Sequence, residues 1–180
     1  MEQVVLVDEN DNEIGTEEKM RAHQNGGKLH RAFSIVVFNS SGEMLIQKRA
    51  LSKYHWAGIW ANTCCSHPRP GENLGDAVER RLMEEMGFKT ELKEVYDFIY
   101  KATFDNGLTE WELDHVFMGL YEENPVPNPE EVGDYRWIGL DELRKEVEEE
   151  PEKYAPWFRI ILGKVDFDKH LDNFLSQRPK

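Results

Sequence analysis

The chain has 180 residues, of which 39% are hydrophobic and 32% are charged. One domain typically takes roughly 100–200 residues, and this composition is typical of a folded protein rather than a disordered one. The formal net charge is −13, from 22 Lys and Arg against 35 Asp and Glu. Because nucleic acids and anionic membranes repel such a chain, the sequence argues against both as partners.

Cysteine usage and hydropathy indicate the compartment. The two cysteines, Cys64 and Cys65, are neighbours and cannot join distant segments through a disulfide, which favours a reducing environment. The N-terminus lacks the basic region and apolar run of a signal peptide. No stretch approaches the roughly 18 apolar residues of a membrane-spanning helix. We therefore expect a cytoplasmic protein, and a monomer as the default for an acidic chain of this size.

The first part of the chain is predicted to be mainly strands. Residues 4–7 form a short apolar run that ends in the turn-rich segment 8–12, and a polar segment follows up to the loop at 25–27. Residues 29–38 and 43–48 are rich in β-branched and aromatic side chains and flank a turn at 39–42. They predict a β-hairpin, and residues 59–65 predict a further strand.

A helix is predicted over residues 74–86. Asn73 is a suitable N-cap, Asp76 is placed to reach back from the third helical position, and Gly87 favours an end to the helix. Apolar residues recur every four positions and form one stripe, at Leu74, Val78, Leu82 and Met86.

The second half of the chain predicts strands and then helices. Residues 92–100 and 108–121 read as two longer strands around a turn at 105–107, and three prolines make 122–131 an exposed loop. Residues 135–138 predict another strand. Residues 140–149 and 156–175 are helical, with an interruption near Gly163. Without repeats or a long linker, strands followed by helices predict one α+β domain.

Charged residues on the predicted helix form two pairs with helical spacing. Arg80 and Glu84 lie four residues apart, as do Arg81 and Glu85, and both pairs face away from the apolar stripe. This arrangement is compatible with a solvated helix laced with ion pairs. It is equally compatible with an oxygen-ligand site for Mg²⁺ beside arginines that clamp a diphosphate.

The same helix resembles the Nudix box. Glu72, a seven-residue gap and the segment RRLMEEMGF at 80–88 follow the box, which ends in R-E-hydrophobic-x-E-E-x-G-hydrophobic. Ser66 stands where the box opens with glycine, and Arg81 replaces the first glutamate of the R-E pair. Hydrolytic Nudix enzymes need clustered carboxylates for several metal ions. An arginine there repels metal and attracts phosphate, which argues against simple diphosphate hydrolysis.

Both departures match one branch of the Nudix superfamily, the type I isopentenyl-diphosphate isomerases, and this resemblance covers nearly the whole chain. Its most specific stretch is NTCCSHP at 62–68. The resemblance implies an α+β fold, a Nudix-type α/β/α sandwich with a mixed sheet. It also implies one domain over residues 1–180, with an N-terminal extension at 1–28 that contributes to a metal site and a degenerate box at 66–88. The other matching positions are 23, 29–34, 48–53, 60–61, 100, 110–112 and 156–157.

A metal site is the next implication of the resemblance. A lone histidine is more often structural than a ligand, and His55, His115 and His170 are expected to be structural. Residues 110 and 112 are two apart on a strand and can approach one ion from the same face, although a polar outer face of an edge strand would look the same. Three imidazoles and two carboxylates suit Mn²⁺, Zn²⁺ or Mg²⁺, and the nitrogen ligands favour a transition metal. The implied ligands are His23, His30, His67, Glu110 and Glu112.

The implied activity is the interconversion of isopentenyl diphosphate and dimethylallyl diphosphate in isoprenoid biosynthesis. A double-bond shift through a tertiary carbocation needs an acid, a base and an electron-rich group in a dry pocket. By resemblance, Cys65 takes one proton-transfer role and Glu112 the other, on opposite faces of the substrate, with Tyr100 assisting. Trp157 would stabilise the cation, and nearby positive charge is expected to make the Cys65 thiolate accessible. Cys65 as a small buried hydrophobe and Trp157 as a core anchor are the structural alternatives.

The resemblance also implies how the diphosphate is held. A second ion, Mg²⁺, would bridge substrate oxygens to Glu85 and to the backbone carbonyl of Cys65. The basic residues would act as a local positive funnel on an acidic protein. They are Lys19, Arg49, Lys53 and Arg81.

The sequence supports three other expectations, one for the two cysteines and two for alternative functions. Cys64 and Cys65 should point to opposite faces of their strand. A Nudix hydrolase of a nucleoside diphosphate derivative is the alternative enzyme, supported by the partial box and opposed by Arg81. A non-catalytic metal- or partner-binding protein is the third candidate, and it leaves the Cys, His and Glu residues without a purpose.

Overall fold

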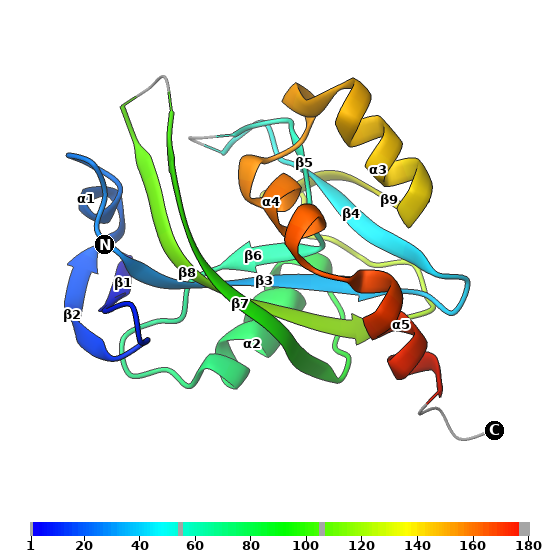
Figure 1. Cartoon of the computed structure of the whole chain (residues 1–180), viewed down its shortest axis with the longest axis horizontal. Helices are drawn as coiled ribbons and strands as arrows, with labels where there is room; N and C mark the ends of the chain where they lie inside the picture. Colours follow the sequence, from blue (N-terminus) through cyan, green and yellow to red (C-terminus); the bar gives the residue numbers. More distant parts are fainter. Residues whose placement is uncertain (1, 54–55, 105–106, 177–180) are drawn as a thin grey trace.

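The protein is built around a curled mixed β-sheet (Figure 1). The computed structural model describes residues 2–53, 56–104 and 107–176. The strands of the sheet are β1 (Gln3–Val7), β2 (Glu13–Glu18), β3 (His30–Phe38), β4 (Glu43–Arg49), β5 (Trp60–Ala61), β6 (Cys64–Ser66), β7 (Leu92–Thr103), β8 (Thr109–Leu120) and β9 (Val132–Gly139). The helices are α1 (Lys19–Ala22), α2 (Leu74–Met86), α3 (Leu140–Glu149), the 3₁₀ turn η1 (Pro151–Lys153), α4 (Pro156–Lys164) and α5 (Phe167–Ser176).

Strand β3 lies at the centre of the sheet. It pairs in parallel with β8 from His30, opposite Glu112, to Phe38, opposite Leu120. On its other side it pairs antiparallel with β6. Strand β8 continues into a long antiparallel pair with β7, and β4 pairs with β9 and β5. The side chains above this centre therefore come from strands on both sides of β3.

The expected hairpin forms, but its strands separate almost at once. Only the last two residues of β3 pair with β4. The strand expected at 59–65 is not continuous, because β5 ends at Ala61 and β6 begins at Cys64. Between them, Thr63 Oγ1 accepts from the Val37 amide at 2.9 Å and donates to the Leu45 carbonyl at 2.6 Å. The Thr63 hydroxyl thus takes the place of backbone hydrogen bonds between β3 and β4. The two strands separate here, and β6 begins at the next residue.

The N-terminal segment contains more structure than its polar sequence indicates. Strand β2 pairs along the whole of β1, and α1 follows it directly. Strand β1 meets β3 at Leu6, opposite His30. The turn at 8–12 is tied down by Asp11, which accepts from Arg31 Nε at 2.7 Å and lies 3.2 Å from His115 Nε2. Because α1 follows this hairpin, Lys19 and His23 are placed beside the central strands.

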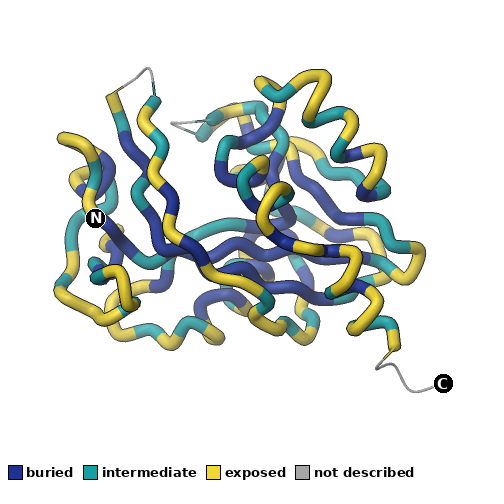
Figure 2. Tube along the Cα trace, viewed as in Figure 1, coloured by how far each residue is buried: buried dark blue, intermediate teal, exposed yellow. Residues whose placement is uncertain are grey.

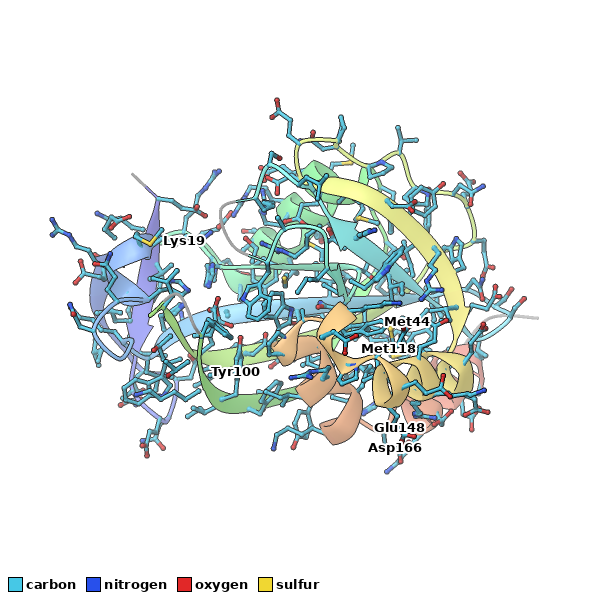
Figure 3. The ribbon with its side chains drawn as sticks, turned by 90° about the horizontal axis from the view of Figure 1, so that it is seen from above. Lys19, Met44, Tyr100, Met118, Glu148 and Asp166 are labelled. Atoms are coloured by element: carbon cyan, nitrogen blue, oxygen red, sulfur yellow. The ribbon has the colours of Figure 1, made fainter. Side chains whose placement is uncertain are left out.

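Helices cover both faces of the sheet, as expected for a Nudix-type sandwich. Helix α2 packs on one face through the predicted apolar stripe, including the fully buried Leu82 and Met86. Helices α3, α4 and α5 cover the other face, where Phe158 and Phe167 are fully buried. Figure 2 shows the buried strands between these more exposed layers, and Figure 3 shows the sheet from above.

Both predicted ends of helix α2 are confirmed. The Asn73 side chain accepts from the Gly75 amide at 2.8 Å, and Gly87 ends α2 with φ 76°. The expected helix at 156–175 is interrupted between α4 and α5, just after Gly163. Two residues of the predicted turn at 105–107, Asp105 and Asn106, lie outside the described residues, as does His55. Within the described ranges, the helices are all too short or too polar to cross a membrane.

Candidate active site

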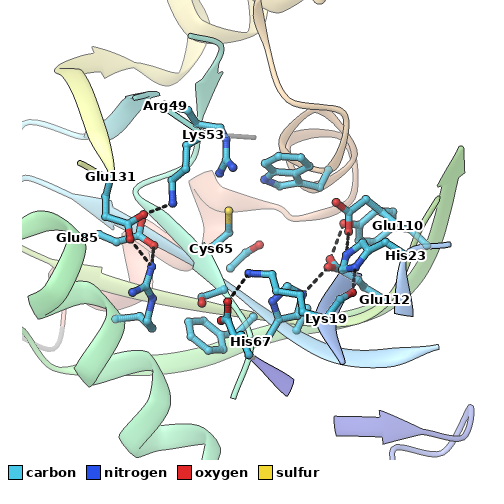
Figure 4. A pocket seen from close by; sticks show the side chains of 18 of the residues that line it. Lys19, His23, Arg49, Lys53, Cys65, His67, Glu85, Glu110, Glu112 and Glu131 are labelled. Atoms are coloured by element: carbon cyan, nitrogen blue, oxygen red, sulfur yellow. Dashed lines mark hydrogen bonds and ion pairs between the residues drawn. The ribbon is translucent and has the colours of Figure 1, made fainter. Parts of the chain in front are cut away.

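A cavity of about 300 Å³ opens over the central strands (Figure 4). The structure brings twelve of the residues singled out in the sequence to its walls, and His30 lies fully buried beside them. Cys65 lies between a group containing Lys53 and Glu85 and a second group containing His23 and Glu112. The twelve are Lys19, His23, Arg49, Lys53, Cys65, His67, Arg81, Glu85, Tyr100, Glu110, Glu112 and Trp157.

Strand parity explains why Cys65 and Glu112 share the cavity. Cys65 on β6 pairs with Ser34 on β3, and Ser34 pairs with Val116 on β8. Glu112 lies four residues before Val116, so it projects from the same face of the sheet. Cys64 projects from the opposite face and is fully buried in the core beneath α2. The expected opposite orientation of the two cysteines is therefore confirmed.

Histidines from three segments converge at one end of the cavity. His23 Nδ1 lies 2.6 Å from the Lys19 carbonyl, and His30 Nδ1 lies 2.8 Å from the Lys28 carbonyl. These contacts assign the Nδ1 atoms as donors and turn the Nε2 atoms inward. Among the described residues, the ligand atoms of one group all lie within 4.8 Å of one another: His23, His30, His67 and Glu112.

This donor set fits a divalent cation. His30 Nε2 and His67 Nε2 face each other at 3.2 Å, and His67 Nε2 lies 2.8 Å from Glu112 Oε1. Burial lowers the pKa of His67 to about 4, against the opposing effect of Glu112, so its imidazole is neutral, as a ligand must be. An inward lone pair on the neutral His67 ring, beside the Glu112 carboxylate, is the arrangement that a cation stabilises.

Glu110 reaches this group through His23. Its Oε2 lies 3.0 Å from His23 Nε2, and both side chains are almost completely buried. Burial lowers the pKa of His23, but the hydrogen bond and the charge of Glu110 outweigh it and raise the pKa to about 9. Glu110 thus lies at the expected place without joining the group of four ligand atoms.

Glu112 is held as a carboxylate. Burial raises its pKa, but hydrogen bonds and charge from His30 and His67 hold it well below the usual range. The Tyr100 hydroxyl donates to Glu112 Oε2 at 2.5 Å. Burial and the charge of Glu112 raise the pKa of Tyr100 well above its usual value, so the phenol keeps its proton.

The Cys65 sulfur is held as a thiol. Burial raises its pKa to about 12, and the neighbouring Arg49 opposes this shift without overcoming it, while Glu85 and Glu112 add to it. The expectation that nearby positive charge would favour the thiolate is therefore wrong. The cavity combines a protonated sulfur with an ionised carboxylate.

Trp157 forms part of the cavity wall and is 5% exposed. Its Nε1 donates to Asn62 Oδ1 at 3.2 Å, which fixes the plane of the indole. The Arg49 guanidinium carbon lies 5.7 Å from the ring centroid, and the Trp56 ring lies edge-on at 6.4 Å. The indole is therefore both packed and available to the cavity.

The cations at the other end of the cavity are paired with carboxylates. Lys53 contacts Glu131, and Arg81 contacts Glu85. The expected positive funnel is wrong, because six carboxylates line the same cavity as the four cations. These are Glu2, Glu85, Glu110, Glu112, Glu130 and Glu131.

Several residues in or beside the site were missed in the sequence, among them Glu131 and Asp114. Glu131 lies at the end of a proline-rich loop, and nothing in its local pattern marks it. Asp114 continues the alternation of Glu110 and Glu112 on β8, and that spacing could have identified it. Asp114 is 1% exposed and accepts from Ser34 Oγ at 2.8 Å. Burial and then Glu112 raise its pKa to about 8.

Comparison with known proteins identifies the fold. The model of the NUDIX domain family matches residues 28–158. A crystal structure of DR0079 from Deinococcus radiodurans is similar with a TM-score of 0.70 and 18% identity, over 96% of this chain and 99% of that one. The MutT protein of Methanosarcina mazei Go1 is similar with a TM-score of 0.60 and 20% identity, over 83% and 96%. The fold is that of the Nudix proteins.

Curated relatives identify the branch of the Nudix family to which the chain belongs. Isopentenyl-diphosphate Delta-isomerase 1 of Aromatoleum aromaticum is 52% identical over 91% of this chain and 92% of its own length. The Isopentenyl-diphosphate Delta-isomerase of Halorhodospira halophila is 48% identical over 90% and 94%. The chain therefore belongs to the Nudix family and, within it, to the isopentenyl-diphosphate Delta-isomerases.

Proposed function

We propose that this enzyme interconverts isopentenyl diphosphate and dimethylallyl diphosphate, by adding a proton at one end of an alkene and removing another. One observation carries the proposal: Cys65 and Glu112, from strands on either side of β3, line the same cavity. The nearby cations suit a small diphosphate. A five-carbon chain anchored by its diphosphate would then lie between the sulfur and the carboxylate.

The protonation states support one assignment of the two proton-transfer roles. The Cys65 thiol adds its proton to the terminal alkene carbon, the π electrons form the new C–H bond, and the tertiary carbon becomes a cation. The Glu112 carboxylate removes a proton from the neighbouring carbon on the diphosphate side, and those C–H electrons form the new double bond. Each turnover moves one proton from Cys65 to Glu112. The pair is restored by exchange with water, and the same steps run in reverse.

Two neighbours support this transfer. Tyr100 holds the Glu112 carboxylate through its hydroxyl, which fixes the oxygen that receives the proton. Trp157 offers its π face to the tertiary cation, an interaction worth roughly 2 kcal/mol when desolvated. The fixed indole also covers the reacting carbons, and it thereby limits capture of the cation by water.

The charged end is proposed to be held by Arg49, Lys53, Lys19 and Arg81, with arginine suited to a bidentate grip on phosphate. Mn²⁺ or Zn²⁺ would be held by His23, His30, His67, Glu110 and Glu112, in part by the N-terminal extension (1–28) of a single domain. Mg²⁺ would be held near Glu85 and the Cys65 carbonyl. When bound, these ions supply positive charge that neutralises the carboxylates and the diphosphate.

Cysteine usage and net charge bear on the compartment and the partners of the enzyme. Free cysteines, Cys64 and Cys65, are typical of the reducing cytoplasm. A net charge of −13 disfavours nucleic acid and anionic membranes as partners. We expect a cytoplasmic monomer that supplies dimethylallyl diphosphate for isoprenoid biosynthesis.

The test is to incubate the metal-loaded protein with isopentenyl diphosphate and Mg²⁺ in D₂O and to follow the products by NMR. Dimethylallyl diphosphate carrying deuterium in the new methyl group is the expected product. Release of phosphate would instead support a hydrolase, and an unchanged substrate would support a non-catalytic binding protein. Either result would overturn the proposed reaction.

A further inference from the structure

One carboxylate at the charged end of the cavity is in contact with two of the cations. Glu131 pairs with Lys53 and lies 3.6 Å from the Arg81 guanidinium. The three side chains are between 17% and 24% exposed, so water only partly screens their charges. Figure 4 shows the Glu131 carboxylate in the cavity wall beside Lys53 and Glu85.

The position of this carboxylate is fixed by its backbone. The Ala50 amide donates to the Glu131 carbonyl at 3.0 Å, and the Glu131 amide donates to the Asn128 carbonyl at 3.0 Å. The Asn128 amide donates in turn to the Glu85 carbonyl at 2.9 Å, at the end of α2. The turn at 128–131 is thus fastened both to the segment that carries Lys53 and to the helix that carries Arg81.

A carboxylate between two cations resembles a phosphate in charge and in its acceptor oxygens. We propose that Glu131 occupies, in the free enzyme, the place that a phosphate group of the substrate takes between Lys53 and Arg81. The incoming diphosphate must displace this carboxylate, so Glu131 competes with it. This inference rests on the proposed function only in that it takes the substrate to be a diphosphate.

The competition has a consequence for affinity. Every anion that takes this place must break the contacts of Lys53 and Arg81 with Glu131, so each loses a similar amount of binding free energy. A diphosphate carries more charge and more acceptor oxygens, and it can also share a divalent cation held near Glu85. Glu131 therefore lowers the affinity for every anion, and an anion with these further contacts keeps enough affinity to bind.

The test measures anion binding rather than turnover. Calorimetry on the metal-loaded protein in excess Mg²⁺ gives the affinities of inorganic phosphate and of pyrophosphate for the wild type and for Glu131→Gln. Removal of the charge should tighten binding of both anions by a similar factor of about tenfold, equivalent to roughly 1.4 kcal/mol. The preference for pyrophosphate over phosphate should stay close to that of the wild type.

Glu130→Gln is the matched control. Glu130 is the exposed neighbour that lines the same cavity, so this change removes the same formal charge one residue away. Its affinities should stay within about twofold of the wild type. If Glu131→Gln does not fold by circular dichroism, Glu131→Ala removes the same charge with a smaller side chain and serves the same test.

Weaker binding of both anions by the Glu131 variants would overturn the inference, because Glu131 would then be positioning the cations for the ligand. Unchanged binding, or equal gains for Glu131→Gln and Glu130→Gln, would overturn it as well. These outcomes are independent of turnover, so they are distinct from a failure of the wild type to isomerise isopentenyl diphosphate.

Discussion

Burial distinguishes the two neighbouring cysteines. Cys64 is fully buried in the core beneath α2, whereas Cys65 lines the cavity. We expect Cys65→Ala to lower kcat by about 10²–10⁴-fold or more, the usual contribution of a positioned acid or base. Cys64→Ala should keep most of the activity and lose about 1 kcal/mol of unfolding free energy through the small cavity it leaves.

Steady-state kinetics and urea unfolding of both variants make this comparison. The two substitutions delete the same atom from adjacent residues, so each is the control for the other. Equal losses of activity would contradict the assignment of Cys65 as the reacting sulfur.

At the residue scale, the sequence identified side chains whose identity is dictated by chemistry. Cys65, Glu112 and the three histidines belong to recognisable motifs, and the structure brings them together. The protonation state of Cys65 could not be predicted in this way, because it depends on how far the fold buries the sulfur. The position of Glu131 depends on backbone contacts with Ala50 and Asn128, which are distant in sequence.

Helix α1 connects the N-terminal hairpin to the histidine group. The Glu18 side chain caps this single turn by accepting from the Met20 amide at 3.0 Å and the Arg21 amide at 3.1 Å. Glu18→Ala should cost about 1 kcal/mol of local stability, and it should loosen the position of His23. Metal affinity, measured by competition with a chromogenic chelator, should fall up to about fivefold.

Glu13→Ala is the control for this change, since it removes the same charge from an exposed position on β2 without touching the α1 cap. An equal fall in metal affinity for both variants would mean that charge, and not the cap, matters.

Gly87 ends α2 and packs against the proline-rich loop at Val126. It has φ 76°, and an added Cβ would lie 2.2 Å from the Val126 carbonyl oxygen. Gly87→Ala should therefore lower the unfolding free energy by more than about 2 kcal/mol, through the left-handed backbone and the clash together. Gly71 has the same φ with nothing within 4 Å of an added Cβ, so Gly71→Ala should cost only about 1 kcal/mol.

Urea denaturation of the two glycine variants gives both values. Similar losses would show that backbone conformation alone, and not the contact with Val126, makes Gly87 necessary.

At the element scale, the sequence predicted what local patterns determine. The stripe and caps of α2 are local, and the helix appears with the predicted ends. The parallel pairing of β3 with β8 joins residues about 80 positions apart, and no local signal specifies it. The break between β5 and β6 arises because Thr63 finds partners on two other strands, and β2 was missed because its exposed residues lack an apolar alternation.

The acid stability of the whole molecule should follow its paired carboxylates. Glu146 accepts hydrogen bonds from Arg136 and from the Tyr154 hydroxyl. Both bonds hold the pKa of Glu146 below its usual range, and the bond from Arg136 has the larger effect. The unfolded chain then binds more protons, so the stabilisation is present above the unfolded pKa and is lost as the pH falls through the folded pKa.

Glu146→Gln should accordingly lower the unfolding free energy at pH 7 by no more than about 1 kcal/mol, because the pair is partly exposed. Urea titrations of wild type and variant between pH 7 and pH 3.5 should show this difference shrinking with acidification. A difference that stays constant over this range would contradict the role assigned to the ionised carboxylate.

The curled sheet of the whole molecule brings Cys65 of β6 and Glu112 of β8 into one cavity, and the proposed reaction places them on either side of the substrate. The most direct measurement uses isopentenyl diphosphate with stereodefined deuterium at both reacting carbons, converted in tritiated water, with the configuration of the product analysed. Addition of the new hydrogen and removal of the old one from opposite faces of the carbon skeleton is the predicted result. Addition and removal on the same face would contradict it.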